Sequence, residues 1–137
     1  MSAEANVALI RQAYSDFKAG NLAAVLDNLT DDVQWITPGA GLPTAGRRHG
    51  KAEVAAFFQV LGQTWDLTAF EPRQFIASGD LVVALGSTSM VARATGKTAS
   101  LDWAMVFQLR DGKVAVFQEM TDTLAAAQTL RAQTATA

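Results

Sequence analysis

The second half of the chain is a run of four strand-like segments with short turn-forming segments between them, and this pattern limits the fold most. The strand-like segments are rich in Val, Leu, Phe, Trp and Thr, whereas the separators contain Gly with Ser, Thr or Asp. In Arg110-Asp111-Gly112, the Asp-Gly pair between two β-rich runs is a strong hairpin signal. We therefore predict an antiparallel meander, with Pro72 disturbing its first strand. The predicted strands span residues 67–77, 81–93, 98–109 and 113–122.

The first half of the chain has the spacing of amphipathic helices. From Val7 to Phe17, apolar side chains recur at steps of three and four residues, and Gly20 suits the end of such a helix. Asn21 can cap a second, shorter helix. A third helix is predicted to bury the apolar side chains between Val54 and Leu61.

The segments between these helices carry weaker signals. Thr30-Asp31-Asp32 is predicted to break the second helix, and residues 33–37 are predicted to form a short strand that Pro38 ends. The glycine-rich segment from Pro38 to Gly50 is predicted to be a loop. Residues 125–131 are predicted to form a terminal helix, followed by a disordered tail over residues 132–137.

Helices followed by a long meander indicate an α+β fold. The length of 137 residues suits one domain, spanning residues 1–137. Four long strands and one short strand would curl around a helix and enclose apolar space. The sequence therefore predicts a curved antiparallel sheet wrapped around the N-terminal helices, with an apolar pocket inside.

The composition narrows the classes of function. Hydrophobic residues make up 50% and charged residues 18%, which excludes a disordered chain and leaves apolar surface to be buried in a pocket or against a second subunit. The formal net charge is −2 and no basic run is present, so we expect no nucleic-acid partner. Cysteine is absent, which excludes disulfides, thiolate nucleophiles and Cys-ligated metals.

Two further features concern the setting of the chain. Its start resembles no signal peptide, and no uncharged run reaches about 18 residues, so we expect a soluble cytoplasmic domain that does not enter a membrane. The strands over residues 81–85 and 103–107 are apolar on both faces, whereas a sheet with one solvated face would alternate with polar residues. We therefore expect a homodimer formed through the outer face of the sheet.

Several short motifs stand out along the chain, at residues 19–22, 29–35, 49–58, 78–83, 109–114 and 119–123. Together with the order of elements, these motifs resemble the SnoaL-like and ketosteroid-isomerase-like branch of the nuclear transport factor 2-like superfamily. This resemblance covers nearly the whole chain and implies a cone-shaped sheet with an apolar cavity, usually dimeric through the outer face. The superfamily includes isomerases, cyclases, epoxide hydrolases, dehydratases and binding proteins, so function must be argued from the site.

The resemblance also shows which known mechanisms this chain lacks. The base Asp of steroid isomerases corresponds to Thr37, and their oxyanion-hole Asp corresponds to Met105, which donates no hydrogen bond. Of the three catalytic residues of limonene-epoxide hydrolases, only the last is retained in kind, as Glu119. SnoaL-like cyclases rely on one acidic base near the end of the last strand, and either Glu119 or Asp122 could be that group here.

Glu119 shares one strand face with Phe117 and Thr121, and the resemblance assigns this face to the cavity. Burial there would raise the pKa of the carboxyl group into the range of a working acid or base. The alternative is an ion pair with an Arg or a place on a polar rim. For Asp122 the alternative is a helix N-cap, and alternation places Asp102 on the outer face.

The remaining candidate residues lie at the mouth or in the wall of the expected pocket. His49 is the only histidine, which disfavours a metal site, and Arg47 and Arg48 flank the pocket mouth. We expect no metal and no cofactor. The predicted ligand-binding residues are Tyr14, Trp35, Thr37, Phe57, Phe58, Trp65, Trp103, Met105 and Phe117.

Three functions fit these residues. The first is a cofactor-free isomerase, lyase or cyclase that acts on a hydrophobic carbonyl compound with Glu119 as its acid/base group. The second is a non-catalytic protein that binds an apolar metabolite. The third is a dimerisation domain with a vestigial cavity.

Overall fold

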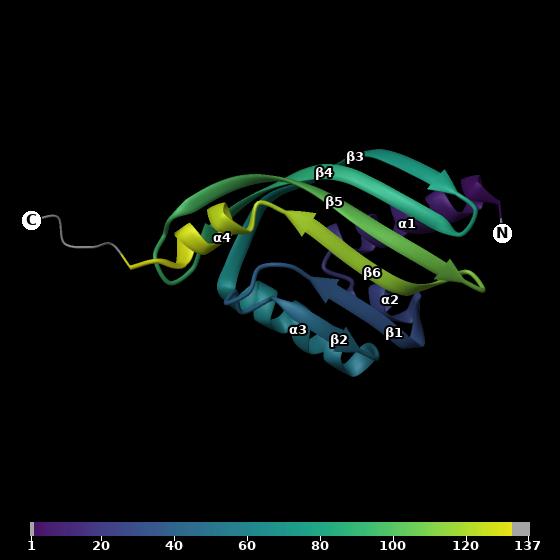
Figure 1. Cartoon of the computed structure of the whole chain (residues 1–137), viewed down its shortest axis with the longest axis horizontal. Coiled ribbons are helices and arrows are strands. Elements are labelled where there is room, and N and C mark those ends of the chain that lie inside the picture. The colour runs from purple at the N-terminus through teal and green to yellow at the C-terminus, as the bar shows by residue number, and fades with distance from the viewer. Residues whose placement is uncertain (1, 133–137) are drawn as a thin grey trace, which may run out of the picture.

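The computed structural model describes residues 2–132 and shows a mixed α+β architecture, as predicted from the order of the elements (Figure 1). Six strands form one curved sheet in the order β2-β1-β6-β5-β4-β3. The elements are α1 (Ala3–Lys18), α2 (Leu22–Asp27), β1 (Leu29–Thr37), β2 (Gly46–His49), α3 (Lys51–Thr64), β3 (Trp65–Ser78), β4 (Leu81–Ala92), β5 (Thr98–Arg110), β6 (Lys113–Thr121) and α4 (Thr123–Leu130). Of the tail predicted over residues 132–137, all but residue 132 lies outside the described residues.

The predicted meander is present as β3, β4, β5 and β6, each paired antiparallel with the next. The turn between β5 and β6 consists of Asp111 and Gly112, both with positive φ angles of 53° and 75°. This is the turn geometry that an Asp-Gly pair favours in a two-residue hairpin. Pro72 lies inside β3, where the register to β4 shifts, and it is tolerated because β3 is an edge strand.

The prediction for the region around the short strand was wrong in two respects. β1 starts at Leu29 rather than at residue 33. Asp31 and Asp32 are exposed within the strand, where the register to β6 shifts between Leu29 and Gln34. The segment predicted as a loop contains β2, which pairs antiparallel with β1 at the sheet edge. β1 in turn pairs parallel with β6, so the sheet is mixed rather than wholly antiparallel.

The helices begin and end close to the predicted residues. Gly20 follows α1 with φ at +77°, and the side chain of Asn21 caps α2 by accepting a hydrogen bond from the backbone N–H of Ala24 at 3.2 Å. At the other end of the chain, the side chain of Asp122 caps α4 by accepting from the N–H of Ala125 at 3.0 Å. Asp122 is exposed, so the structure gives it the N-cap role rather than a place in the cavity. No helix in residues 2–132 combines the length and the apolar character needed to cross a membrane.

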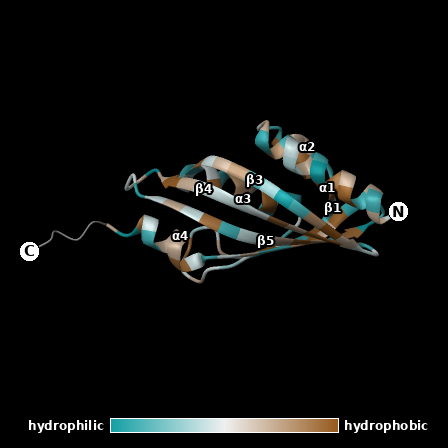
Figure 2. Cartoon of the chain, turned by 90° about the horizontal axis from the view of Figure 1, so that it is seen from above, coloured by the Kyte–Doolittle hydropathy of each residue, from teal (hydrophilic) through white to brown (hydrophobic). Residues whose placement is uncertain are grey.

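The core lies between the helices and one face of the sheet, which we call the inner face. Alternation along β4 and β5 directs Val82, Ala84, Trp103, Met105 and Phe107 to this face, where they pack with side chains of α1 and α3. Figure 2 shows hydrophobic residues along β3, β4 and β5. A smaller cluster around Trp65 and Ala126 joins α4 to the sheet.

Candidate functional site

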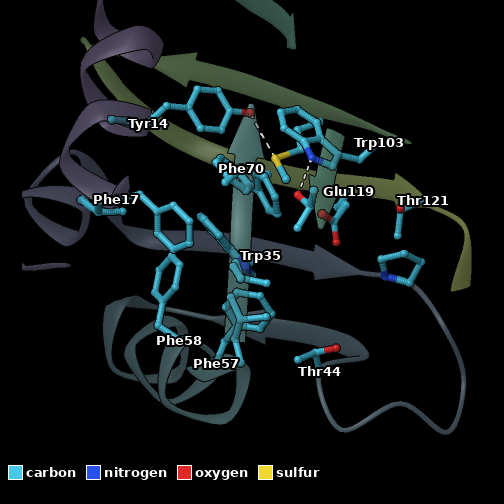
Figure 3. A pocket seen from close by; sticks show the side chains of 18 of the residues that line it. Tyr14, Phe17, Trp35, Thr44, Phe57, Phe58, Phe70, Trp103, Glu119 and Thr121 are labelled. Carbon is cyan, nitrogen blue, oxygen red and sulfur yellow. Dashed lines mark hydrogen bonds between the residues drawn. The ribbon is translucent and has the colours of Figure 1, made fainter. Parts of the chain in front are cut away.

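A cavity of about 140 Å³ opens on the inner face of the sheet, between the strands and the helices (Figure 3). An apolar cavity of roughly 150 Å³ is large enough to take up benzene. Its lining is mostly aromatic and aliphatic, and Glu119 is the only charged residue among the lining residues in the described part of the chain. The cavity therefore suits a small apolar molecule with few polar groups.

The structure brings the predicted site residues together around this cavity, with one exception. Thr37 is buried but does not line the cavity, because its hydroxyl donates a hydrogen bond to the backbone carbonyl of Thr44. The loop after β1 folds over Thr37, and Thr44 from that loop lines the cavity instead. The predicted residues that line the cavity are Tyr14, Trp35, Phe57, Phe58, Trp65, Trp103, Met105, Phe117 and Glu119.

Two stacks of aromatic rings form part of the cavity wall. The rings of Trp35 and Phe117 stack at 3.9 Å between centroids with an interplanar angle of 22°. The indole of Trp103 stacks on Phe70 at 5.3 Å and 21°, and on Tyr14 at 5.8 Å and 29°. Flat aromatic surfaces of this kind favour a flat apolar ligand.

Glu119 lies near the end of β6, opposite Met105 of β5, and its side chain faces the cavity together with Phe117 and Thr121. Burial raises the pKa of the Glu119 carboxyl group to about 7. In residues 2–132, no Lys, Arg or His nitrogen lies within 4.0 Å of this carboxyl group, so no cation offsets the loss of solvation. A carboxyl group with a pKa near 7 can both accept and donate a proton around neutral pH.

Tyr14 of α1 places its hydroxyl on the same part of the cavity wall. Burial, with a smaller contribution from the charge of Glu119, raises the pKa of the Tyr14 phenol, so the group stays protonated. Its hydroxyl donates a hydrogen bond to the sulfur of Met105 at 3.1 Å, drawn as a dashed line in Figure 3. A thioether is a weak acceptor, so a ligand with a better acceptor can compete for this proton.

Comparison with known proteins identifies the family of this chain. A family model described as a SnoaL-like domain matches residues 10–117. The chain belongs to the SnoaL-like domain family. No curated protein matches the chain.

Several solved structures are similar over nearly the whole SnoaL-like chain. A nuclear transport factor 2-like protein from Burkholderia xenovorans LB400 has 30% identity and a TM-score of 0.88, covering 96% of this chain and 99% of its own. A similar protein of unknown function from Burkholderia pseudomallei K96243 has 29% identity and a TM-score of 0.87, covering 96% of this chain and 100% of its own. TerC, crystallised with polyporic acid, has 26% identity and a TM-score of 0.83, covering 91% of this chain and 97% of its own.

Arg47 and Arg48, which we expected at the cavity mouth, are not among the residues that line the cavity. Arg48 donates to the backbone carbonyl of Thr44 at 2.9 Å and lies over the ring of Phe57, with its guanidinium carbon 5.0 Å from the centroid. Arg48 therefore holds the loop that covers Thr37, whereas Arg47 and His49 are exposed. Within the described residues, no three His, Cys, Asp or Glu side chains are grouped so that they could hold a metal ion.

The sequence interpretation missed part of the cavity lining. Phe17 lay in the predicted helix stripe, and Phe70 in a predicted strand, but neither was assigned to the site. Thr88 also lines the cavity, and the alternation of β4 with Ala84 and Met90 was the signal that could have placed it there. Asp102 is exposed, as alternation predicted.

Proposed function

We propose that this SnoaL-like protein binds a flat, largely apolar carbonyl compound and moves one of its protons with Glu119, without a cofactor. The observation that carries the proposal is the Glu119 carboxyl group, which is alone among apolar side chains and has a pKa of about 7. A buried carboxyl group without a cation costs stability, and such groups are frequent at catalytic sites.

The proposed chemistry is general acid–base catalysis at a carbon next to a carbonyl group. The ionised Glu119 takes a proton from that carbon, the C–H electron pair forms a C=C bond, and the negative charge moves to the carbonyl oxygen. Returning the proton to another atom gives isomerisation. When the proton on Glu119 first exchanges with solvent, its return to the same carbon gives isotope exchange. The raised pKa makes Glu119 a stronger base than an ordinary carboxylate.

The comparisons support a small organic ligand for this cavity. TerC, at 26% identity, was crystallised with polyporic acid. The aromatic stacks of Trp35 with Phe117 and of Trp103 with Phe70 are suited to hold flat rings.

One observation favours a binding protein without catalysis as the second candidate. The hydroxyl of Tyr14 donates to the sulfur of Met105, and the lining offers no second carboxyl group in the described part of the chain. A mechanism that needs a separate acid and base would lack one partner. The third candidate, a dimerisation domain with a vestigial cavity, is disfavoured by the open volume of about 140 Å³.

We also infer that the protein is a homodimer through the outer face of the sheet. Along each strand, every second side chain points away from the core and lies on this outer face. Several of these side chains are apolar, and no helix or strand of the described residues packs over them. Val83 and Val106 are paired neighbours on β4 and β5 and are half-buried, and the exposed fraction is 39% for Leu81 and 44% for Met120. A second copy of the same face would cover these side chains.

Deuterium exchange into 1-indanone tests the proposed catalysis, because this flat ketone has exchangeable protons next to its carbonyl group. We expect the protein to accelerate exchange, and Glu119→Gln to reduce that acceleration roughly 10²- to 10⁴-fold with the fold intact. Glu71→Gln, at an exposed position of β3, is the matched control and should exchange like the wild type. Equal exchange in wild type and Glu119→Gln would leave the binding protein as the better account.

A further inference from the structure

The indole of Trp103 is held in one orientation on the inner face of the sheet. It stacks on both Phe70 and Tyr14, and its Nε1 donates a hydrogen bond to the hydroxyl oxygen of Thr88 at 2.8 Å. Figure 3 draws this bond as a dashed line from the nitrogen of Trp103. Both Trp103 and Thr88 are cavity-lining residues, with exposed fractions of 5% and 6%.

Gly86 of β4 provides the space in which this indole lies. A Cβ atom at Gly86 would come within 2.6 Å of ring carbons of Trp103, closer than side chains tolerate, and would also meet the backbone carbonyl of Glu71. Gly86 pairs directly with Trp103 across the two strands. The close approach of Trp103 to β4, and hence its bond to Thr88, therefore depends on the glycine.

The bond from Trp103 determines how the hydroxyl of Thr88 can be used. A hydroxyl has one proton to donate and accepts through its lone pairs. Thr88 already accepts from Trp103, and its own proton makes no hydrogen bond within residues 2–132. An unused donor in a buried position costs free energy unless a ligand or water accepts from it.

The other neutral donors of the cavity wall are less available. The proton of Tyr14 is engaged by the sulfur of Met105. The indole N–H of Trp35 has no partner, but the nitrogen is fully enclosed by protein. Asn28 and Thr44 also line the cavity, but in residues 2–132 no hydrogen bond fixes their side chains. Thr88 combines a proton without a partner and an oxygen that Trp103 holds in place.

We propose that the hydroxyl of Thr88 donates a hydrogen bond to the carbonyl oxygen of the bound compound, with Trp103 as the residue that positions it. This assignment takes the class of ligand, a carbonyl compound, from the proposed function. It makes Thr88 a specificity-determining residue, because the site favours a flat molecule with a carbonyl oxygen over the same molecule without one. A site built around a donor discriminates against a ligand that leaves the donor unpaired.

The test compares two probes of nearly the same shape, 1-indanone, which has a carbonyl group, and indane, which has none. Their dissociation constants are measured by calorimetry for the wild type, Thr88→Val, which keeps the shape, and Thr88→Ser, which keeps the hydroxyl. We expect Thr88→Val to weaken binding of 1-indanone about 3- to 10-fold more than binding of indane, the range of one neutral hydrogen bond. The lost bond to Trp103 affects both probes alike. Thr88→Ser should retain most of the preference for 1-indanone.

Three results would overturn the assignment. They are equal weakening of both probes by Thr88→Val, no effect of Thr88→Val on either probe, and a wild type that does not prefer 1-indanone to indane. The deuterium-exchange experiment with Glu119→Gln is independent of this binding ratio. A preserved ratio with no catalysed exchange would therefore contradict the proposed catalysis and support the role of Thr88.

Discussion

Both faces of the sheet carry apolar side chains, but of different kinds. Along β5, the inner face carries Trp103, Met105 and Phe107, whereas the outer face carries Ala104 and Val106. Large aromatic rings meet at angles and leave a cavity, whereas short aliphatic side chains make a flat surface. The difference indicates that the inner face is suited to hold a small molecule and the outer face to pack against another sheet.

The largest expected effect tests the outer face. We predict that Val106→Asp dissociates the dimer, because it places two unpaired carboxylates at the centre of the proposed interface. Each buried charge without a partner costs about 4 kcal/mol, so one alone raises the dissociation constant about 10³-fold and the second raises it further. Light scattering at micromolar concentration should then give a mass near the 14.5 kDa of one chain, with the wild type near twice that value.

Two controls make this result specific to the outer face. Gln59→Asp, at an exposed position of α3, adds the same charge away from the sheet and should leave the mass unchanged. Binding of 1-indanone should survive in Val106→Asp, because the inner face is not altered. A wild type with the mass of one chain would contradict the dimer.

The alternation of side chains along the strands was predictable from the sequence, but the choice of the inner face was not predictable from hydropathy. The pattern places Phe117, Glu119 and Thr121 on one side of β6, yet Val116 and Met120 make the other side nearly as apolar. Only the family resemblance assigned the Phe117 face to the cavity. Two apolar faces give no amphipathic contrast from which to choose.

Two other features depended on contacts between distant segments. The segment of β2 has no apolar residue to indicate a strand, and it forms because the edge of β1 offers unpaired backbone groups. Thr37 shares the inward direction of Trp35, but the loop that Arg48 holds covers it. The pairing of Trp103 with Thr88 likewise required the side-chain geometry of two strands.

An effect of intermediate size tests the inner face through its pH dependence. The pKa of Glu119 is raised from 4.5 to about 7 on folding, so the folded state binds the proton more tightly than the unfolded state. The stability that this proton provides is fully present below pH 4.5 and is lost as the pH rises through 7. We expect a decrease of about 3 kcal/mol in the free energy of unfolding from this group over that window.

Urea unfolding at several pH values between 4.5 and 8, at one protein concentration, measures this decrease. Glu119→Gln removes the titrating group and should flatten the profile relative to the wild type, whereas Glu71→Gln should keep the wild-type slope. Parallel profiles for wild type and Glu119→Gln would show that the carboxyl group is not desolvated in the folded protein.

The smallest expected effect compares the two faces by the same chemical exchange, Met for Leu. Met105→Leu nearly conserves volume on the inner face but removes the sulfur that accepts the hydrogen bond from Tyr14. The buried hydroxyl then lacks a partner, so we expect a loss of about 1 kcal/mol in the free energy of unfolding. The freed proton of Tyr14 can be donated to a carbonyl ligand, so binding of 1-indanone should tighten a few-fold while binding of indane stays constant.

Leu85→Met makes the reverse exchange at a half-buried position of the outer face, where no hydrogen bond is involved. It should change neither the free energy of unfolding nor the binding of 1-indanone measurably. If Met105→Leu unfolds like the wild type and binds 1-indanone equally well, the hydrogen bond from Tyr14 to the sulfur of Met105 contributes neither to stability nor to the selection of the ligand.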